Sequence, residues 1–332
     1  MWESFSSPEI CRLALAIGAF VAVKYKDKYG VIPGGIIVPG FIITLFFISP
    51  IWCLTVIALS FLVYGIYQKF LAKTGYKRRT PMYLLATLSL AIANLVALIY
   101  IQIGWLSPSL DSLSGTLLPA VIAFTFTKQK MVKVVKGIVI TTLITAIIVG
   151  VIYGIGSTYF HFDFDLLRPI YAGKETLQIK YPLVQFYVAL AVGYFIYRWQ
   201  DVRSGGYMIA PVAVALLTQP ISAVAFLLGC FTVYWLTKII CQFTFLIGLK
   251  RYALVLVIST VFVWSIELVF AYLDSTILPF QGSNIFVIIA MMSYVNDYIL
   301  YTDKKIGTCL AISIITAFTV ALLSNLAALI FV

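Results

Sequence analysis

The sequence is poor in charged residues. Only 11% of its 332 residues are Asp, Glu, Lys or Arg, whereas 62% are hydrophobic and the mean hydropathy is +1.05. A water-soluble core of ordinary proportions cannot bury that much apolar surface, so the composition excludes a typical soluble domain. Apolar runs of roughly 15 to 25 residues recur along the whole chain, which is the length range of membrane-spanning helices. We therefore expect an all-α integral membrane protein.

The sequence also lacks the residues of common catalytic and metal sites. It contains no GxxxxGK[ST], HExxH or GxSxG motif. Its one histidine, His161, stands beside Asp163 and Asp165 in a polar stretch, where we interpret it as a loop residue. Its five cysteines form no CxxC pair, so we interpret them as packing residues. The sequence predicts no catalytic residue, cofactor site or metal site in this chain.

About twelve membrane passes are expected. The approximate spans are 10–23, 31–49, 51–72, 81–103, 115–127, 137–154, 183–198, 206–219, 221–243, 252–273, 284–300 and 306–331. Several of them, notably 115–127 and 206–219, are too short to cross about 30 Å of hydrocarbon at 1.5 Å per residue, so we expect broken or re-entrant helices. If the N-terminus lies outside, 19 of the 23 basic residues fall on the cytoplasmic side. The excess of Lys and Arg over acidic residues therefore indicates membrane orientation rather than nucleic-acid binding.

The chain repeats itself. The stretch TGYKRRTPMYLLATLSLAIANLV (74–96) resembles IGLKRYALVLVISTVFVWSIELV (247–269) at an offset of 173 residues, and other landmarks recur at offsets of 167 to 170. We therefore predict a first membrane repeat over 1–154, an extracytoplasmic linker over 155–182 and a diverged second repeat over 183–332. Six passes in each copy would give both copies the same orientation, as parallel repeats.

Glycine and proline interrupt the spans at equivalent places. The segment GIIVP at 35–39 has a counterpart, GTLLP, at 115–119, and each leads into a short apolar run. Broken helices are tolerated within a membrane where protein or a wet cavity receives the unpaired backbone groups, and their N-termini suit anions. Close helix packing by glycine is the alternative interpretation. The candidate residues of an anion or polymer path are Gly34, Gly35, Pro39, Gly40, Gly115, Pro119, Gly205, Gly206 and Pro211.

These motifs are similar to those of a known family. The segments YGVIPGGIIVPGFI (29–42), GYKRR (75–79) and SGTLLPAVIAFTFTKQK (114–130) resemble, in order and spacing, the small membrane subunit of poly-γ-glutamate synthases (PgsC/CapC). The second half matches more loosely, through GGYMIAPVAVALL (205–217) and GSNIFVIIAMMSY (282–294). Because typical members are much shorter, the chain resembles two such subunits fused. It also resembles the membrane domains found beside ATP-grasp ligases, which implies an alternative function as the membrane partner of an ATP-grasp ligase that makes another peptide-like product.

The resemblance implies a role in making or exporting an anionic γ-linked glutamate polymer at the bacterial cytoplasmic membrane. It implies a cytoplasmic ATP-dependent amide ligase similar to Mur ligases, which would use ATP and Mg²⁺, and an extracytoplasmic accessory subunit as partners. Matched basic clusters in the two copies are candidates for receiving the polymer or docking the ligase, although they also suit a purely topological role: Lys77, Arg78, Arg79, Lys250 and Arg251.

A polar residue occupies the same depth in both copies. Glu267 is embedded in the apolar run VFVWSIELVFAY, and the offset of 173 places it opposite Asn94. An intramembrane carboxylate is costly, so it is a functional candidate for proton coupling or gating, although a structural hydrogen bond would explain it equally well. Proton coupling would fit a different function, a secondary transporter of a small organic anion. A membrane acyl or glycosyl transferase is disfavoured because no span contains a histidine or paired carboxylates.

Overall fold

The structure, a computed structural model, contains helices and connecting loops but no strands in the part of the chain that it describes. That part comprises residues 8–72, 80–105, 115–159, 182–200, 220–273, 279–280 and 284–300, together with 315, 318–323 and 326. The predicted all-α class is therefore confirmed. The chain divides into two compact units, Met1–Ile170 and Tyr171–Val332, and the boundary falls inside the segment 155–182 that the sequence predicts as a linker.

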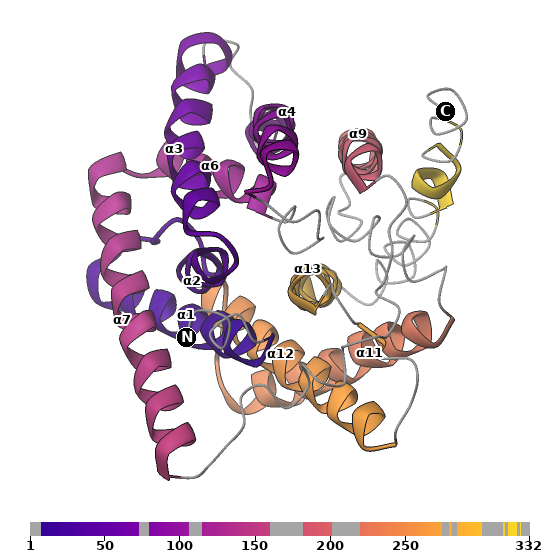
Figure 1. The fold of residues 1–332 in the computed structure, drawn as a ribbon. Coiled ribbons are helices and arrows are strands. Elements are labelled where there is room, and N and C mark those ends of the chain that lie inside the picture. The colour runs from indigo at the N-terminus through magenta and orange to yellow at the C-terminus, as the bar shows by residue number, and fades with distance from the viewer. Residues whose placement is uncertain are drawn as a thin grey trace. The chain divides into compact units, whose positions relative to one another are not determined.

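The first unit contains two groups of packed helices. In the first group, α1 packs against α2 and α7; in the second, α3, α4 and α6 pack against one another (Figure 1). α2 also touches α3, α6 and α7, and so joins the groups. The helices are α1 (Pro8–Tyr29), α2 (Val38–Ile48), α3 (Pro50–Ile66, continued by the π-helical turn η2, Tyr67–Leu71), α4 (Thr80–Ile103), α6 (Leu118–Lys128, preceded by the 3-10 turn η4, Gly115–Leu117) and α7 (Met131–Tyr159).

Short polar and glycine signals set the ends of these helices. α1 ends at Gly30, which has φ +68° and donates its N–H to the carbonyl of Lys26 at 2.7 Å. Ser49 separates α2 from α3, because its extended backbone stops α2 while its side chain accepts a hydrogen bond from the N–H of Trp52. The 11-residue α2 is therefore too short to cross a membrane by itself.

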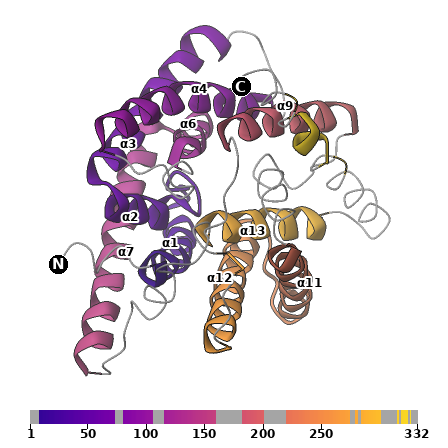
Figure 2. The same ribbon diagram turned by 45° about the vertical axis from the view of Figure 1, so that its right-hand side comes forward.

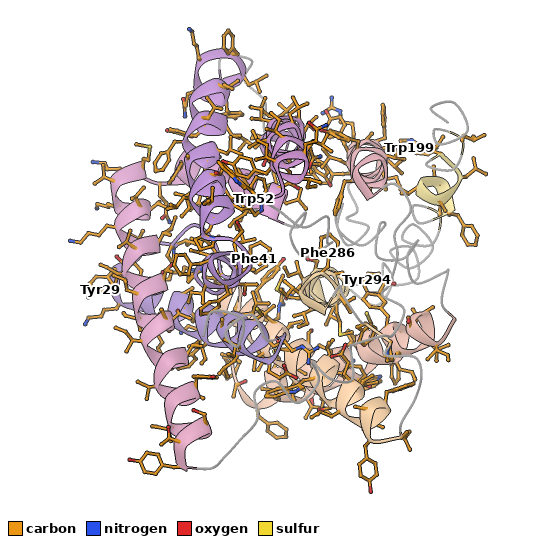
Figure 3. The ribbon with its side chains drawn as sticks, in the orientation of Figure 1. Tyr29, Phe41, Trp52, Trp199, Phe286 and Tyr294 are labelled. Atoms are coloured by element: carbon orange, nitrogen blue, oxygen red, sulfur yellow. The ribbon has the colours of Figure 1, made fainter. Side chains whose placement is uncertain are left out.

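Aromatic contacts hold α3, α4 and α6 together. Trp52 of α3 (Figure 3) is fully buried, and its ring meets that of Tyr100 of α4 edge to face at 5.8 Å. The Tyr100 hydroxyl also lies 2.8 Å from the hydroxyl of Thr55 on α3. Phe126 of α6 stacks on Phe61 of α3, with 5.5 Å between the ring centroids. These contacts hold α4 and the short α6 against α3.

α7 shows the burial pattern of a helix that faces lipid. Its buried side carries small and hydroxyl residues such as Gly137, Thr141 and Thr145. Its opposite side exposes large apolar residues at a spacing of four: Val139, Leu143, Ile147 and Val151. Because a water-soluble helix would bury this second row, the pattern supports a membrane environment.

The second unit is built around three mutually packed helices. Its helices are α9 (Pro182–Gln200), α11 (Pro220–Phe243), α12 (Leu249–Tyr272) and α13 (Asn284–Leu300). α11 and α12 run side by side, and α13 lies across both (Figure 2). A Cβ placed on Gly229 of α11 would lie only 2.5 Å from Met291 and 2.6 Å from Phe262, so this glycine permits the close approach. Phe186 of α9 meets Phe286 of α13, labelled in Figure 3, at 5.3 Å.

Among the described residues, five helices are long and apolar enough to cross a membrane. They are Pro50–Leu71, Thr80–Ile103, Met131–Tyr159, Ile221–Phe243 and Leu249–Tyr272. Shorter apolar helices occupy Val38–Phe47, Gly115–Lys128 and Ile285–Asn296. The chain is therefore a multi-helix membrane protein with short as well as spanning helices, whereas twelve passes in two parallel repeats remain a prediction. The expected spans 206–219 and most of 306–331 lie outside the described residues.

Candidate functional site

The glycine-rich loop between α1 and α2, residues 30–37, is fastened to α6. The backbone N–H of Ile32 donates to the side-chain carbonyl of Gln129 at 3.0 Å, and the hydroxyl of Thr125 donates to the carbonyl of Gly34 at 2.7 Å. Thr125 is on the last turn of α6, and Gln129 directly follows that helix. Two side chains far away in the sequence thus satisfy backbone groups that a broken helix leaves unpaired.

The two interrupted segments meet inside the first unit. Gly34 has φ +71° and Gly35 has φ +141°, a backbone conformation that favours glycine. A Cβ on Gly35 would lie 3.1 Å from Val121 in the first turn of α6. Conversely, a Cβ on Gly115 would lie 3.1 Å from Leu45 of α2. The structure therefore brings the predicted residues at 34–35 and at 115 to one helix pair, α2 and α6.

Both helices of this pair begin without a side-chain cap. α2 starts after Ile37 and α6 after Leu117, and neither of these residues makes a capping hydrogen bond through its side chain. Pro39 and Pro119 stand in the first two positions of their helices, where proline is preorganised for the helix and gives up an N–H that has no intrahelical partner. Each helix therefore presents a partial positive charge at its start.

The hydroxyl of Thr125 is expected to be the main clamp on the loop. Thr125→Val keeps the shape of the side chain but removes the 2.7 Å bond to Gly34, and should destabilise the protein by about 1–2 kcal/mol. Thr127→Val is the matched control, because the Thr127 hydroxyl bonds only to the carbonyl of Phe124 within its own helix. Thermal unfolding in detergent measures both. Equal melting temperatures for the two variants would contradict the clamp.

Gly40 lies at a helix crossing. A Cβ on Gly40 would collide with the carbonyl oxygen of Ala14 and lie 2.6 Å from the Cα of Leu15, both on α1. The reciprocal contact is equally tight, because a Cβ on Gly18 would lie 2.7 Å from the Cα of Gly40. The geometry gives Gly40 a packing role between α1 and α2, which is the alternative that the sequence leaves open.

Asn94 and Glu267 are both buried. Asn94 is 4% exposed on α4, and neither atom of its side-chain amide has a hydrogen-bond partner within the described structure. Glu267 is fully buried on α12, which packs against α11 and α13. Polar groups at such positions are costly in a membrane interior and mark candidate functional sites. The structure keeps both residues as candidates.

The remaining predicted residues fall in two groups. Lys250, which is exposed, and Arg251, which is half-buried, lie in the first turn of α12 after Gly248. The others lie outside the described residues: Lys77, Arg78, Arg79, Gly205, Gly206 and Pro211. Their proposed roles remain predictions.

Sequence reasoning missed two features of the first unit. It did not select Thr125 or Gln129, since a single Thr or Gln after an apolar run gives no signal of its own. It also did not select Arg12 and Glu9, which the structure buries on α1. The spacing of this pair, one helical turn with opposite charges, was the available signal.

The described residues contain no cluster of three or more His, Cys, Asp or Glu that could hold a metal ion. In the same part of the chain the cysteines are free thiols: Cys11, Cys53, Cys230 and Cys241.

Comparison with known proteins points to one family. The model of the family described as "Capsule biosynthesis CapC" matches residues 17–135 and again residues 188–294. The "PGA biosynthesis protein CapC" of Bacillus subtilis (strain 168) is 29% identical over 153 residues, which cover 45% of this chain and 94% of the relative. No solved structure matches the chain significantly. The family match covers all of the interrupted segments α2 and α6.

Proposed function

This chain belongs to the capsule biosynthesis CapC family, and we propose on this basis that it is a membrane subunit of the machinery that makes poly-γ-glutamate. The observation that carries the proposal is the family match itself, which covers 17–135 and 188–294. The name of the Bacillus subtilis relative assigns that protein to PGA biosynthesis, and this chain spans almost the whole length of that relative. The apolar helices are consistent with a membrane role.

The chain would be two subunits in tandem. Each of the two family matches contains a trio of mutually packed helices: α3, α4 and α6 in the first unit, and α11, α12 and α13 in the second. Asn94 on α4 and Glu267 on α12, which the sequence offset of 173 residues pairs, are both buried. Both the packing and the burial support the repeat that the sequence predicts, over 1–154 and 183–332.

The proposed role is non-catalytic. The chain would anchor a cytoplasmic Mur-ligase-like amide ligase, which would supply the ATP and Mg²⁺ chemistry, and it would act beside an extracytoplasmic accessory subunit. The membrane would be the bacterial cytoplasmic membrane, with the N-terminus outside. The pair of uncapped helices α2 and α6 would lie along the path of the anionic polymer, with their positive ends toward its carboxylates.

Affinity purification tests the partner. The full chain, extracted from its native host in mild detergent, is expected to carry a stoichiometric ATP-dependent amide ligase that mass spectrometry identifies. The purified assembly should then form γ-glutamyl polymer when ATP, Mg²⁺ and glutamate are added. A chain that remains folded and purifies alone would contradict the proposal.

Substitution at the interrupted segment tests the path. Gly35→Leu adds a side chain at a position with φ +141° and 3.1 Å from Val121, so it should distort the α2–α6 pair and reduce polymer output. Gly65→Leu is the control, because a Cβ on Gly65 meets nothing within 4 Å. Polymer output per inserted protein is the measurement. Unchanged output from a correctly inserted Gly35→Leu variant would reduce the glycine to a packing residue.

The complete burial of Glu267 favours one second candidate, a proton-coupled secondary transporter of a small organic anion. This candidate predicts anion uptake into proteoliposomes by the chain alone, and loss of uptake in Glu267→Gln. Polymer synthesis that requires a ligase would exclude it as the main activity.

A further inference from the structure

Three basic segments of the first unit converge on the glycine-rich loop 30–37. One is the end of α1, a second is the end of α6 with the following turn, and the third is the start of α7. Together they carry seven lysines, which we name the lysine collar: Lys24, Lys26, Lys28, Lys128, Lys130, Lys133 and Lys136. Asp27 is the one acidic residue within these three segments.

Specific contacts bring the segments together. A Cβ on Gly137, in the second turn of α7, would lie 3.1 Å from the ring of Tyr25 on α1 and 3.3 Å from Pro33 of the loop. Gln129, between Lys128 and Lys130, holds the N–H of Ile32 at 3.0 Å. The collar is therefore a feature of the fold, because its α1 segment is about a hundred residues from the other two, which are consecutive, and all three share one loop. Figure 3 labels Tyr29, the last residue of α1, beside α7.

The ammonium groups of the collar are available for binding. Six of the seven lysines are exposed and Lys26 is half-buried. The Nζ atoms of three of them lie over aromatic rings: that of Lys24 is 5.5 Å from the ring centre of Phe20, that of Lys28 is 5.4 Å from that of Tyr29, and that of Lys128 is 5.3 Å from that of Phe124. A stem that lies along apolar surface keeps the charged end at the edge of the apolar region.

Helix stability does not explain all of these charges. Lys26, Lys28 and Lys128 stand in last turns, where a cation is favourable. Lys133, however, stands in the first turn of α7, where the helix macrodipole disfavours a cation. Stabilisation of the helix macrodipole therefore does not explain Lys133.

We propose that the lysine collar binds the carboxylates of a polyanionic chain and delivers it to the loop that leads into α2. The identification of this polyanion as poly-γ-glutamate rests on the proposed function. Charge complementarity selects the ligand class, since a row of closely spaced carboxylates gains from many ammonium groups at once. The position of the collar favours the polymer over scattered lipid headgroups as the ligand, because the segments that carry the lysines contact the loop that precedes the uncapped start of α2.

Binding of labelled poly-γ-glutamate to the full chain tests the collar. The chain is placed in nanodiscs of zwitterionic phosphatidylcholine, and affinity is measured at low and physiological salt. The double variant Lys133→Gln, Lys136→Gln is expected to bind about tenfold more weakly, and its binding should depend less on salt. The matched control is Lys69→Gln, Lys238→Gln, which removes two exposed lysines outside the collar and should change affinity less than about twofold. Lys133→Arg, Lys136→Arg should bind like the wild type.

Each of three results would contradict the proposal that the lysine collar binds the polymer. The first is equal polymer affinity for the collar and control variants, once protease accessibility shows the same orientation for both. The second is loss of ligase co-purification with unchanged polymer binding, which would make the collar a protein-docking surface. The third is abolition of wild-type polymer binding when phosphatidylglycerol is added to the nanodiscs, which would assign the collar to lipid headgroups. In all three cases the proposed function would stand or fall separately, on ligase co-purification and polymer synthesis by the wild-type chain.

Discussion

Gly40→Ala is expected to leave little folded protein, although it adds only one methyl group. The new Cβ would collide with the carbonyl oxygen of Ala14 and lie 2.6 Å from the Cα of Leu15. Both atoms belong to the backbone of α1, so the clash cannot be relieved by turning a side chain. Overpacking of this kind costs about 1–3 kcal/mol, and more where backbones must separate. The loop 30–37 connects α1 to α2, so separation of these helices would also disturb the loop.

Gly65→Ala is the matched control for this substitution. Gly65 lies within α3, and a Cβ there meets nothing within 4 Å, so alanine should be neutral or stabilise the helix by up to about 1 kcal/mol. Gly18→Ala, on the other side of the crossing, should behave like Gly40→Ala. Fluorescence-detected size exclusion and thermal unfolding in detergent measure all three variants. A Gly40→Ala protein as stable as the control would show that α1 and α2 are not in this close contact. Gly40 would then again be a candidate residue of the polymer path.

The helices were largely predictable because their signals are local. Apolar runs predict spans at 81–103, 221–243 and 284–300, and the structure has α4, α11 and α13 there within one residue at each end. The prediction was less accurate where charged residues continue a helix. It began a span at 137, whereas α7 begins at Met131, because lysines can occupy a helix outside the apolar part of a membrane.

The sequence predicted the interrupted segments of the candidate site but not the contacts that bring them together. Repeated glycine and proline identified 34–35 and 115–119 as interruptions, and the structure places both at the α2–α6 pair. The clamps on the loop join residues 91 and 97 positions apart, and no local pattern predicts such pairs. The sequence alone also could not assign different roles to Gly40 and Gly35, because each is a glycine next to a proline or another glycine. In the structure Gly40 packs against α1, whereas Gly35 adopts a positive φ.

Asn94→Leu is expected to make the protein more stable. The Asn94 amide is buried, and neither its nitrogen nor its oxygen has a hydrogen-bond partner in the described structure. Burying such a group costs about 1–3 kcal/mol, and leucine has a similar shape without that cost. Thermal unfolding in detergent should therefore show a higher melting temperature. A higher melting temperature would show that the Asn94 amide lowers the stability of the fold, as expected of a polar residue kept for a use other than folding.

Ser89→Ala on the same helix is expected to have the opposite effect. The hydroxyl of Ser89 donates to the carbonyl of Thr116 at 2.7 Å, and so ties α4 to the turn before α6. Loss of this hydrogen bond in Ser89→Ala should destabilise the protein by about 1–2 kcal/mol.

Polymer output separates the possible roles of Asn94. If Asn94→Leu stabilises the chain and loses polymer output, Asn94 contacts the polymer or the water around it. If it stabilises the chain and output is unchanged, the amide has no part in polymer handling, and if it destabilises the chain, Asn94 is bonded within the fold.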